Sequence, residues 1–496
     1  MMDKKNAWET YSETQLQEVM ELGEEYRRFI SENKTERECA AAAVDMAKAH
    51  GYRSLREIID AKETLKPQDK VYYVMMDKSI VLFHLGDRPL EEGLHILGAH
   101  IDSPRLDLKQ NPLYESDELG FFKTHYYGGI RKYQWVTIPL ELHGVVALKN
   151  GEVVRVSVGN GPDDPMFTID DLLPHLATDQ VKKPLGEAIP AESLNILVGS
   201  RPLRDDEGSD RVKLSVLELL NRKYGIVEED FLSAELCAVP AFRAVDIGFD
   251  RSLIGAYGHD DRVCAYASLA ALLQLGTPER TAVCMLADKE EIGSEGVTGM
   301  KSAAFDTFME DLCQSQNVPL RACYEKSFCL SADVTAAYDP NFADVYEKRN
   351  SAFVNYGMGL CKYTGARGKS GASDASAELV AYVRRVLDGA GVVWQMAELG
   401  KADQGGGGTV AVFMAERNCA WRSSTASWAS CSSADSFSAP SPGRQLAQMS
   451  RTAVCEATCP PPWPPRPSAT TQQSEPPSAV TIWTQSSLSS RPPMSV

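Results

Sequence analysis

Short apolar runs that lead into histidine or acidic residues recur along this chain of 496 residues. The run Leu94-His-Ile-Leu-Gly-Ala-His ends at His100, and the run Thr281-Ala-Val-Cys-Met-Leu-Ala comes just before Glu290. Their length and apolar content are typical of buried strands, and stretches with helical periodicity lie between them. This alternation predicts an α/β sheet, which would bind ligands at the carboxyl ends of its strands.

The strand-and-helix pattern is interrupted once. Helical periodicity extends over residues 12–49, and strand-like runs begin at Lys70. Between Ser103 and Val245 the chain instead shows alternating strands, one starting at Trp135 and another at Val153. We therefore expect an α/β domain built from residues 1–102 and 246–418, with an inserted β-rich domain at residues 103–245.

The composition changes after Asn418. Of the 27 prolines, 12 lie beyond this point, together with many serines, no lysine and only three acidic residues. No packed element is predicted for residues 419–496, which have the composition of a Pro- and Ser-rich disordered tail.

Charge and cysteine usage limit the partners and the compartment. A net charge of −17 disfavours nucleic acid and anionic membranes, so peptides or small molecules are the expected ligands. The first thirty or so residues carry charges throughout, which predicts neither a signal peptide nor a membrane span. A cytoplasmic location is the default expectation. Eight of the 12 cysteines lie singly in apolar runs before residue 418 and are expected to be reduced core thiols.

Two motifs could supply metal ligands. In Gly98-Ala-His-Ile-Asp, His100 and Asp102 point to the same side of a strand end, where a carboxylate can orient a metal-binding imidazole. A strand-end histidine beside a loop aspartate is the plainer explanation. Asp260 and Asp261 open a predicted helix, where acids usually interact with the helix dipole. A carboxylate there could also bridge two cations.

Two further acidic motifs follow apolar runs. Glu290 and Glu291 come after a buried strand, so one carboxylate could bind metal while the other acts as a general base, although a solvated acidic loop would look the same. Asp333 directly follows the run Phe328-Cys-Leu-Ser-Ala. The four motifs lie in order at successive strand ends, and their mixed oxygen and nitrogen donors suit zinc best.

In these segments the chain resembles the aspartyl aminopeptidase family, which includes the aminopeptidase I type and its bacterial relatives. The resemblance is carried by GAHIDSPR, GHDDRVC, DKEEIGSEG, SADVTAAYDPNF and ELGKADQGGGGT, all in order, and extends to about residue 418. It implies a mixed-sheet exopeptidase with two zinc ions that removes N-terminal residues from peptides. It also implies that the inserted domain forms dimers and that the subunits assemble into a tetrahedral dodecamer.

The resemblance further implies individual roles at the metal centre. His100 and Asp333 would hold one zinc ion, Asp260 would bridge both, and Glu291 would hold the second. Asp102 would orient His100. Glu290 would take a proton from the attacking water, which the two cations acidify, and would then protonate the leaving amine.

Other roles concern the substrate. His175 would reach the active site of a neighbouring subunit, although an ordinary surface or interface histidine fits this position equally well. Lys369 and the glycines at 405–408 would lie beside the substrate, although four glycines also suit a flexible turn.

The chain departs from the family at its second zinc site. A final histidine ligand is expected beyond Thr409, yet all eight histidines lie at or before His259, and the expected region reads Ala429-Ser-Cys-Ser-Ser. Loss of one base near the codon of Asn418 would explain this, because restoring it permits an apolar strand pattern, Met-Arg-Val-Glu-Ile-Leu-Asp-Cys. Resequencing the gene tests that hypothesis, and a genuine tail is the alternative.

Two other functions stay open at this stage. Without the last imidazole, the chain could be a catalytically impaired oligomeric scaffold or a peptide-binding homologue. A zinc carboxypeptidase or amide deacylase on a related core would use a similar set of ligands. The number of bound metal ions, and the end of a peptide that is trimmed, separate these possibilities.

Overall fold

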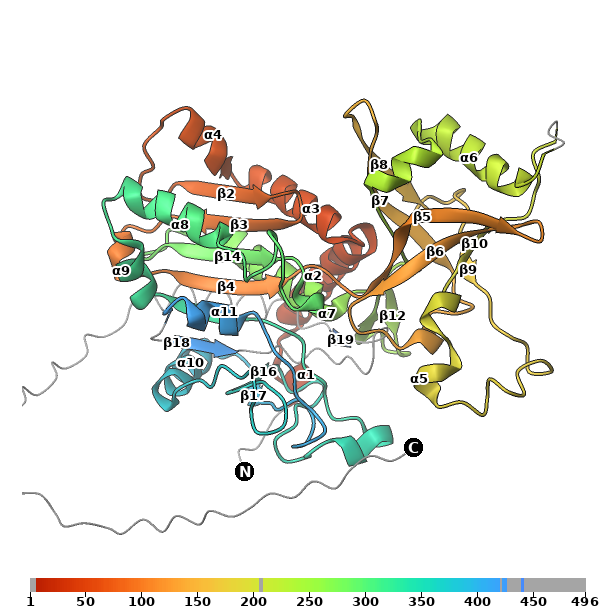
Figure 1. Cartoon of the computed structure of the whole chain (residues 1–496). Helices are drawn as coiled ribbons and strands as arrows, with labels where there is room; N and C mark the ends of the chain where they lie inside the picture. Colours follow the sequence, from red (N-terminus) through yellow and green to blue (C-terminus); the bar gives the residue numbers. More distant parts are fainter. Residues whose placement is uncertain (1–5, 205–207, 420–421, 426–438, 441–496) are drawn as a thin grey trace, which may run out of the picture. The chain divides into compact units, whose positions relative to one another are not determined.

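The computed structural model describes residues 6–204, 208–419, 422–425 and 439–440 (Figure 1). These residues belong to one unit, which runs from Met1 to Cys459. Two seven-stranded sheets organise them, one mixed and one antiparallel, together with two smaller sheets. Within the described residues, no helix has both the length and the apolar character needed to cross a bilayer.

The first sheet has the strand order β1-β2-β3-β14-β4-β15-β18. Its strands are β1 (Arg53–Ser54), β2 (Lys70–Met75), β3 (Ser79–His84), β14 (Ala282–Ala287), β4 (His95–His100), β15 (Phe328–Ser331) and β18 (Arg422–Thr425). Strands β14, β4, β15 and β18 are mutually parallel. Ala287 pairs with His100 and Ser331 with Gly98, so three carboxyl ends meet at one edge of the sheet.

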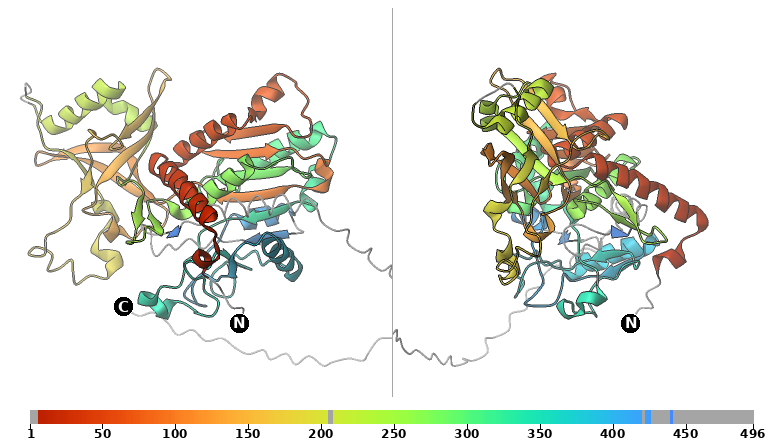
Figure 2. Two further views of the ribbon diagram at one scale, coloured as in Figure 1. Left: turned by 180° about the vertical axis from the view of Figure 1, so that it is seen from behind. Right: turned by 90° about the vertical axis from the view of Figure 1, so that its right-hand side faces the viewer.

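Helices cover both faces of this sheet (Figures 1 and 2). One face shares a core with α2 (Glu13–Glu32), α3 (Glu36–Ala49), α7 (His259–Leu273) and α10 (Ala377–Gly389). The other packs against α4 (Leu55–Asp60), α8 (Ala304–Ser315), α9 (Leu320–Glu325) and α11 (Ala411–Glu416). Capping boxes at Ser12 and Thr35 start α2 and α3. The predicted α/β sheet and helical opening are confirmed.

The second sheet is antiparallel, with the order β8-β7-β11-β5-β6-β10-β9. Its strands are β5 (Arg105–Ser116), β6 (Leu119–Tyr127), β7 (Leu140–Ala147), β8 (Val153–Val158), β9 (Thr168–Ile169), β10 (Ile196–Gly199) and β11 (Ala234–Pro240). The segment also contains α5 (Leu185–Ala188) and α6 (Arg211–Tyr224). All these strands lie within the segment predicted as an insertion. The domain boundaries stay a prediction, because both sheets belong to the same unit.

The strand predicted to begin at Trp135 is wrong in its start. Strand β7 begins only at Leu140, and Trp135 and Val136 enter the core of the second sheet from a loop. Thr137 has a φ of 61°, which is incompatible with a strand, and Pro139 has no N–H to donate to a ladder. Burial alone therefore produced the strand-like pattern before Leu140.

The remaining elements are short. They are α1 (Ala7–Thr10), a sheet of β12 (Val245–Ile247), β13 (Leu253–Gly255) and β19 (Ala439–Pro440), and a pair formed by β16 (Met358–Leu360) and β17 (Trp394–Met396). The expectation of no packed element after Asn418 is wrong for β18 and β19, which pair with β15 and β13. Pairing at a sheet edge uses backbone groups and needs no apolar pattern. The rest of the tail, including residues 429–433, lies outside the described residues.

The cysteines in the described part of the chain are buried and form no disulfide there, as predicted for the eight that lie before residue 418. They are Cys39, Cys237, Cys264, Cys284, Cys313, Cys323, Cys329, Cys361 and Cys419.

Candidate metal centre

The polar residues singled out in the sequence converge at the carboxyl edge of the first sheet. His100 is the last residue of β4, Glu290 follows β14 in a short 3-10 turn, and Asp333 follows β15. Asp260 and Asp261 arrive from the start of α7. Because β4, β14 and β15 are parallel and in register, His100, Glu290 and Asp333 lie close together. The start of α7 brings Asp260 and Asp261 to the same place.

The imidazole of His100 is buried, and oxygen atoms of neighbouring residues contact both of its ring nitrogens. Its Nδ1 lies 3.2 Å from Asp102 Oδ1 and 3.1 Å from the Asp102 carbonyl oxygen. Its Nε2 lies 3.1 Å from Asp260 Oδ1 and 3.8 Å from Glu290 Oε2. Nε2 therefore faces a space shared with carboxylates, as it would if it held a cation.

Asp102 holds several parts of the centre together. Its carboxylate, which is fully buried, accepts backbone N–H bonds from Glu290 to Oδ1 (3.1 Å) and from Glu291 to Oδ2 (3.2 Å). The hydroxyl of Tyr127 also donates to Oδ2, at 2.8 Å. Burial raises the pKa of Asp102, but bonds to His100 and its other donors lower it below its usual value. Asp102 is thus an ionised acceptor that touches both the imidazole and the glutamate turn.

Two groups of side chains have ligand atoms within 4.8 Å of one another. One consists of His100, Asp261 and Asp333, and the other of His100, Asp260 and Glu291. The family resemblance also paired His100 with Asp333 and Asp260 with Glu291, but it shared Asp260 between the two sets, whereas here His100 belongs to both groups; the individual roles stay a prediction. Asp261, which was given no role, is the addition: its Oδ2 accepts the His100 backbone N–H at 3.3 Å.

The two aspartates reach the centre because the start of α7 is irregular. Asp260 (φ −80°, ψ 109°) and Asp261 (φ −115°, ψ 31°) do not have helical backbone angles. In a regular helix, neighbouring side chains would diverge by about 100°, so only one would face the edge of the sheet. The sequence placed both in a first helical turn and therefore gave no sign that Asp261 faces the same space.

The crowding of carboxylates raises their pKa values. Burial raises the pKa of Asp261 and of Asp333, and neighbouring aspartates add to the effect. Burial and the Asp260 charge raise the pKa of Glu291 to about 9. Asp261 Oδ1 is buried without a hydrogen-bond partner. A divalent cation of the zinc type would relieve the repulsion among these carboxylates, so one imidazole and four carboxylates fit such an ion.

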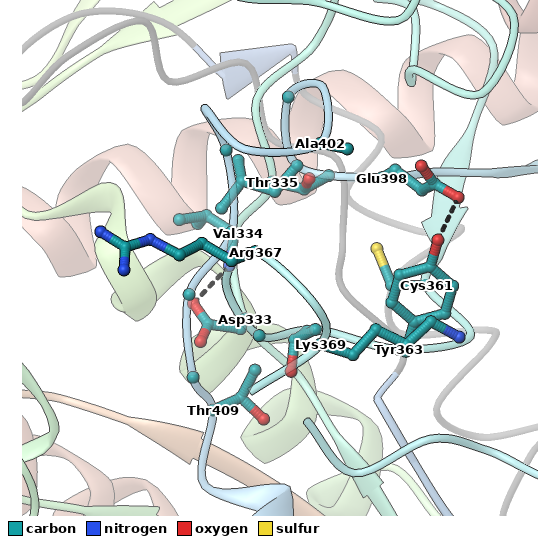
Figure 3. Close-up of a pocket in the computed structure, with 18 of the residues that line it drawn as sticks. Asp333, Val334, Thr335, Cys361, Tyr363, Arg367, Lys369, Glu398, Ala402 and Thr409 are labelled. Carbon is teal, nitrogen blue, oxygen red and sulfur yellow. Dashed lines mark hydrogen bonds between the residues drawn. The ribbon is translucent and has the colours of Figure 1, made fainter. Parts of the chain in front are cut away.

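A cavity of about 440 Å³ opens beside these residues (Figure 3). Asp260, Glu290 and Asp333 form part of its wall, and Lys369 and the glycines at 405–408 form another part. Lys369 stacks on the Tyr363 ring at 3.7 Å and pairs with Asp374 at 3.1 Å. The structure thus places both predicted substrate-side features in the same cavity as the candidate ligands.

His175 does not approach the centre within its own chain. It lies exposed between β9 and α5, in a segment that also exposes Leu172, Leu173 and Leu176. Its predicted reach into a neighbouring subunit is a property of an assembly and stays a prediction.

Comparison with known proteins identifies the family. Residues 29–419 match the family model described as aminopeptidase I zinc metalloprotease (M18). A probable M18 family aminopeptidase 1 from Clostridium acetobutylicum is 51% identical over 420 residues, covering 84% of this chain and 90% of that protein. The crystal structure of an M18 aminopeptidase from Thermotoga maritima has a TM-score of 0.85 at 40% identity, covering 92% of this chain and 99% of the other.

A more distant likeness concerns the fold alone. The S. cerevisiae mApe1 dodecamer has a TM-score of 0.71 at 21% identity, covering 89% of this chain and 99% of that one. The matched segments contain His100, Asp260, Glu290, Glu291 and Asp333, and the family match ends at Cys419, next to the change of composition. The chain belongs to the aminopeptidase I family of zinc metalloproteases.

Proposed function

We propose that this protein is a zinc-dependent aminopeptidase that uses two metal ions and Glu290 as general base. The observation that carries the proposal is the convergence of His100 and a set of acidic side chains on the wall of one cavity. Family membership supports the aminopeptidase activity, and the donor set supports zinc.

The residues divide into two ligand sets around the imidazole. His100 and Asp333 would hold one ion, Glu291 the other, and Asp260 would contribute to both. Asp261 lies among the ligand atoms of the first set, close enough to act as an additional ligand. It also accepts a hydrogen bond from the backbone N–H of His100. When bound, the two zinc ions would acidify a water molecule and polarise the scissile carbonyl.

Glu290 is positioned to move the proton. Its side chain is 22% exposed, lines the cavity and has an oxygen 3.8 Å from His100 Nε2, while its backbone N–H is held by Asp102. It can therefore take a proton from the attacking water and give it to the amine that leaves. The Gly-rich loop at 405–408 and Thr409 would lie against the backbone of the N-terminal substrate residue.

Self-association is part of the proposal. The dodecamer of the fold relative and the exposed leucines around His175 support an assembly in which this segment meets a second copy. Leu172, Leu173 and Leu176 would be covered there, and His175 would enter the neighbour's cavity to contact substrate.

The test compares the wild-type chain with Glu290→Gln, using aminoacyl chromogenic substrates and N-terminal sequencing of trimmed peptides. We expect the variant to keep its zinc and to lose turnover by about 10²–10⁴-fold. Turnover that survives the substitution would remove Glu290 from the role of base. Wild-type protein that trims peptides from the carboxyl end would overturn the aminopeptidase assignment.

A further inference from the structure

The second sheet reaches into the metal centre through one side chain. Tyr127 is the last residue of β6, and its hydroxyl donates a 2.8 Å hydrogen bond to Asp102 Oδ2. Asp102 in turn contacts the His100 ring and the backbone of Glu290 and Glu291. The Tyr127 hydroxyl, from the second sheet, therefore binds the same carboxylate that contacts His100, Glu290 and Glu291.

The ring of Tyr127 is held in place from behind. Arg105 pairs with Tyr127 across the β5–β6 ladder, and its guanidinium lies 4.0 Å from the centre of the Tyr127 ring. The guanidinium is itself fixed by Glu36 at 2.9 Å and by Asp107 at 2.7 Å. Glu36 is the first residue of α3, which packs on the first sheet, so these contacts connect the second sheet to a helix of the first. An anchored ring gives its hydroxyl little freedom to leave Asp102.

The next residue supports the other side of the centre. Gly128 has a φ of 72°, and a Cβ built there would lie 3.2 Å from Glu291 Cβ and 3.4 Å from Glu291 Oε2. A side chain at this position would press on Glu291, in a backbone conformation that favours glycine. The end of β6 thus contacts Asp102 through Tyr127 and Glu291 through Gly128.

We propose that Tyr127 is a positioning residue of the metal centre, which holds Asp102 in the orientation that aims His100 and the Glu290–Glu291 turn. The second sheet then has a role in metal binding within its own subunit, besides any role in assembly. Loss of the hydroxyl removes one of the donors that hold the Asp102 carboxylate, so the imidazole and the Glu290–Glu291 turn are held less firmly. Partners that orient a ligand in this way typically change metal affinity by about 10–100-fold.

The test is Tyr127→Phe, which keeps the ring beneath Arg105 and removes only the hydroxyl. The matched control is Tyr126→Phe, the same change one residue earlier on the same strand, where the side chain is 41% exposed. Zinc affinity is measured by competition with a chromophoric chelator, and ligand geometry by the visible spectrum of the cobalt-substituted protein. We expect Tyr127→Phe to bind zinc about 10–100-fold more weakly, with a shifted cobalt spectrum, and Tyr126→Phe to match the wild type.

The inference rests on the proposed function, and the outcomes keep the two apart. Wild-type protein that binds neither zinc nor cobalt would overturn the metalloenzyme proposal, and with it any role for Tyr127. Wild-type binding with unchanged affinity and spectrum in folded Tyr127→Phe would overturn the positioning role alone, even if the melting temperature fell. If Tyr127→Phe does not fold, Arg105→Lys takes its place, since it keeps the hydroxyl but removes the planar group over the ring. The expected direction and the refuting result are the same.

Discussion

We expect this protein to lose stability as the pH rises from about 6.5 to about 9, because of one buried histidine in β7. His143 is fully buried, with Nδ1 2.7 Å from Glu38 Oε1 in α3 and Nε2 3.3 Å from Glu141 Oε1. The second contact has ion-pair distance without hydrogen-bond geometry. Lys34 lies 3.5 Å from the same Glu141 oxygen. Two carboxylates, Glu38 and Glu141, thus offset the charges of Lys34 and protonated His143 where α3 meets the second sheet.

The size of this loss in unfolding free energy follows from the pKa of His143. Burial lowers this pKa, but the two glutamates raise it from 6.5 to about 9 in the folded protein. The folded chain then keeps a proton that the unfolded chain has lost, so stability is fully present below pH 6.5 and falls as the pH approaches 9. At 1.36 kcal/mol per pKa unit, the loss amounts to about 3 kcal/mol.

The assay is guanidinium-induced unfolding followed by tryptophan fluorescence at a series of pH values, for wild type and His143→Gln. Trp135, in the core of the second sheet, supplies a signal close to the junction. Groups away from this junction titrate equally in both proteins, so the difference between their unfolding free energies reports on His143 and its contacts. We expect this difference to shrink by about 3 kcal/mol between pH 6.5 and 9. A difference that does not depend on pH would refute the charge balance.

Three further predictions concern the site. Gly406→Ala should abolish turnover and lower the melting temperature, because its Cβ would lie 2.1 Å from the Gly365 carbonyl oxygen, whereas Gly276→Ala, which has open space and does not line the cavity, should behave as wild type in both measurements. Removing zinc at pH 7 should cause proton uptake, measured in weak buffer, because the pKa of Glu291 is about 9 without a cation; release of protons would contradict it. Elemental analysis should find two zinc ions per chain, as the proposed function requires, and fewer than two would show that the second ion needs the histidine that the sequence lacks.

The sequence predicted the parts of the fold that rest on apolar periodicity and strand ends. His100, Glu290 and Asp333 were placed correctly at one edge, because parallel strands bring their carboxyl ends together whatever lies between them. Asp261 was missed because its contribution depends on irregular backbone angles at the start of α7, which leave no mark in the sequence pattern. Tyr127 was missed because its contact with Asp102 is between two sheets, and sequence periodicity does not predict such contacts. An aromatic residue in a β-rich segment is usually part of the hydrophobic core, so nothing in the sequence singles it out.

Strand β18 extends the first sheet next to the candidate metal centre. It pairs in parallel with β15, from Phe328 opposite Arg422 to Ser331 opposite Thr425, so its carboxyl end points to the same edge as Asp333. The residues that follow β18, from 426 to 438, lie outside the described part of the chain. The frame hypothesis stays a prediction, which resequencing the gene tests: an intact frame at the codon of Asn418 would refute it.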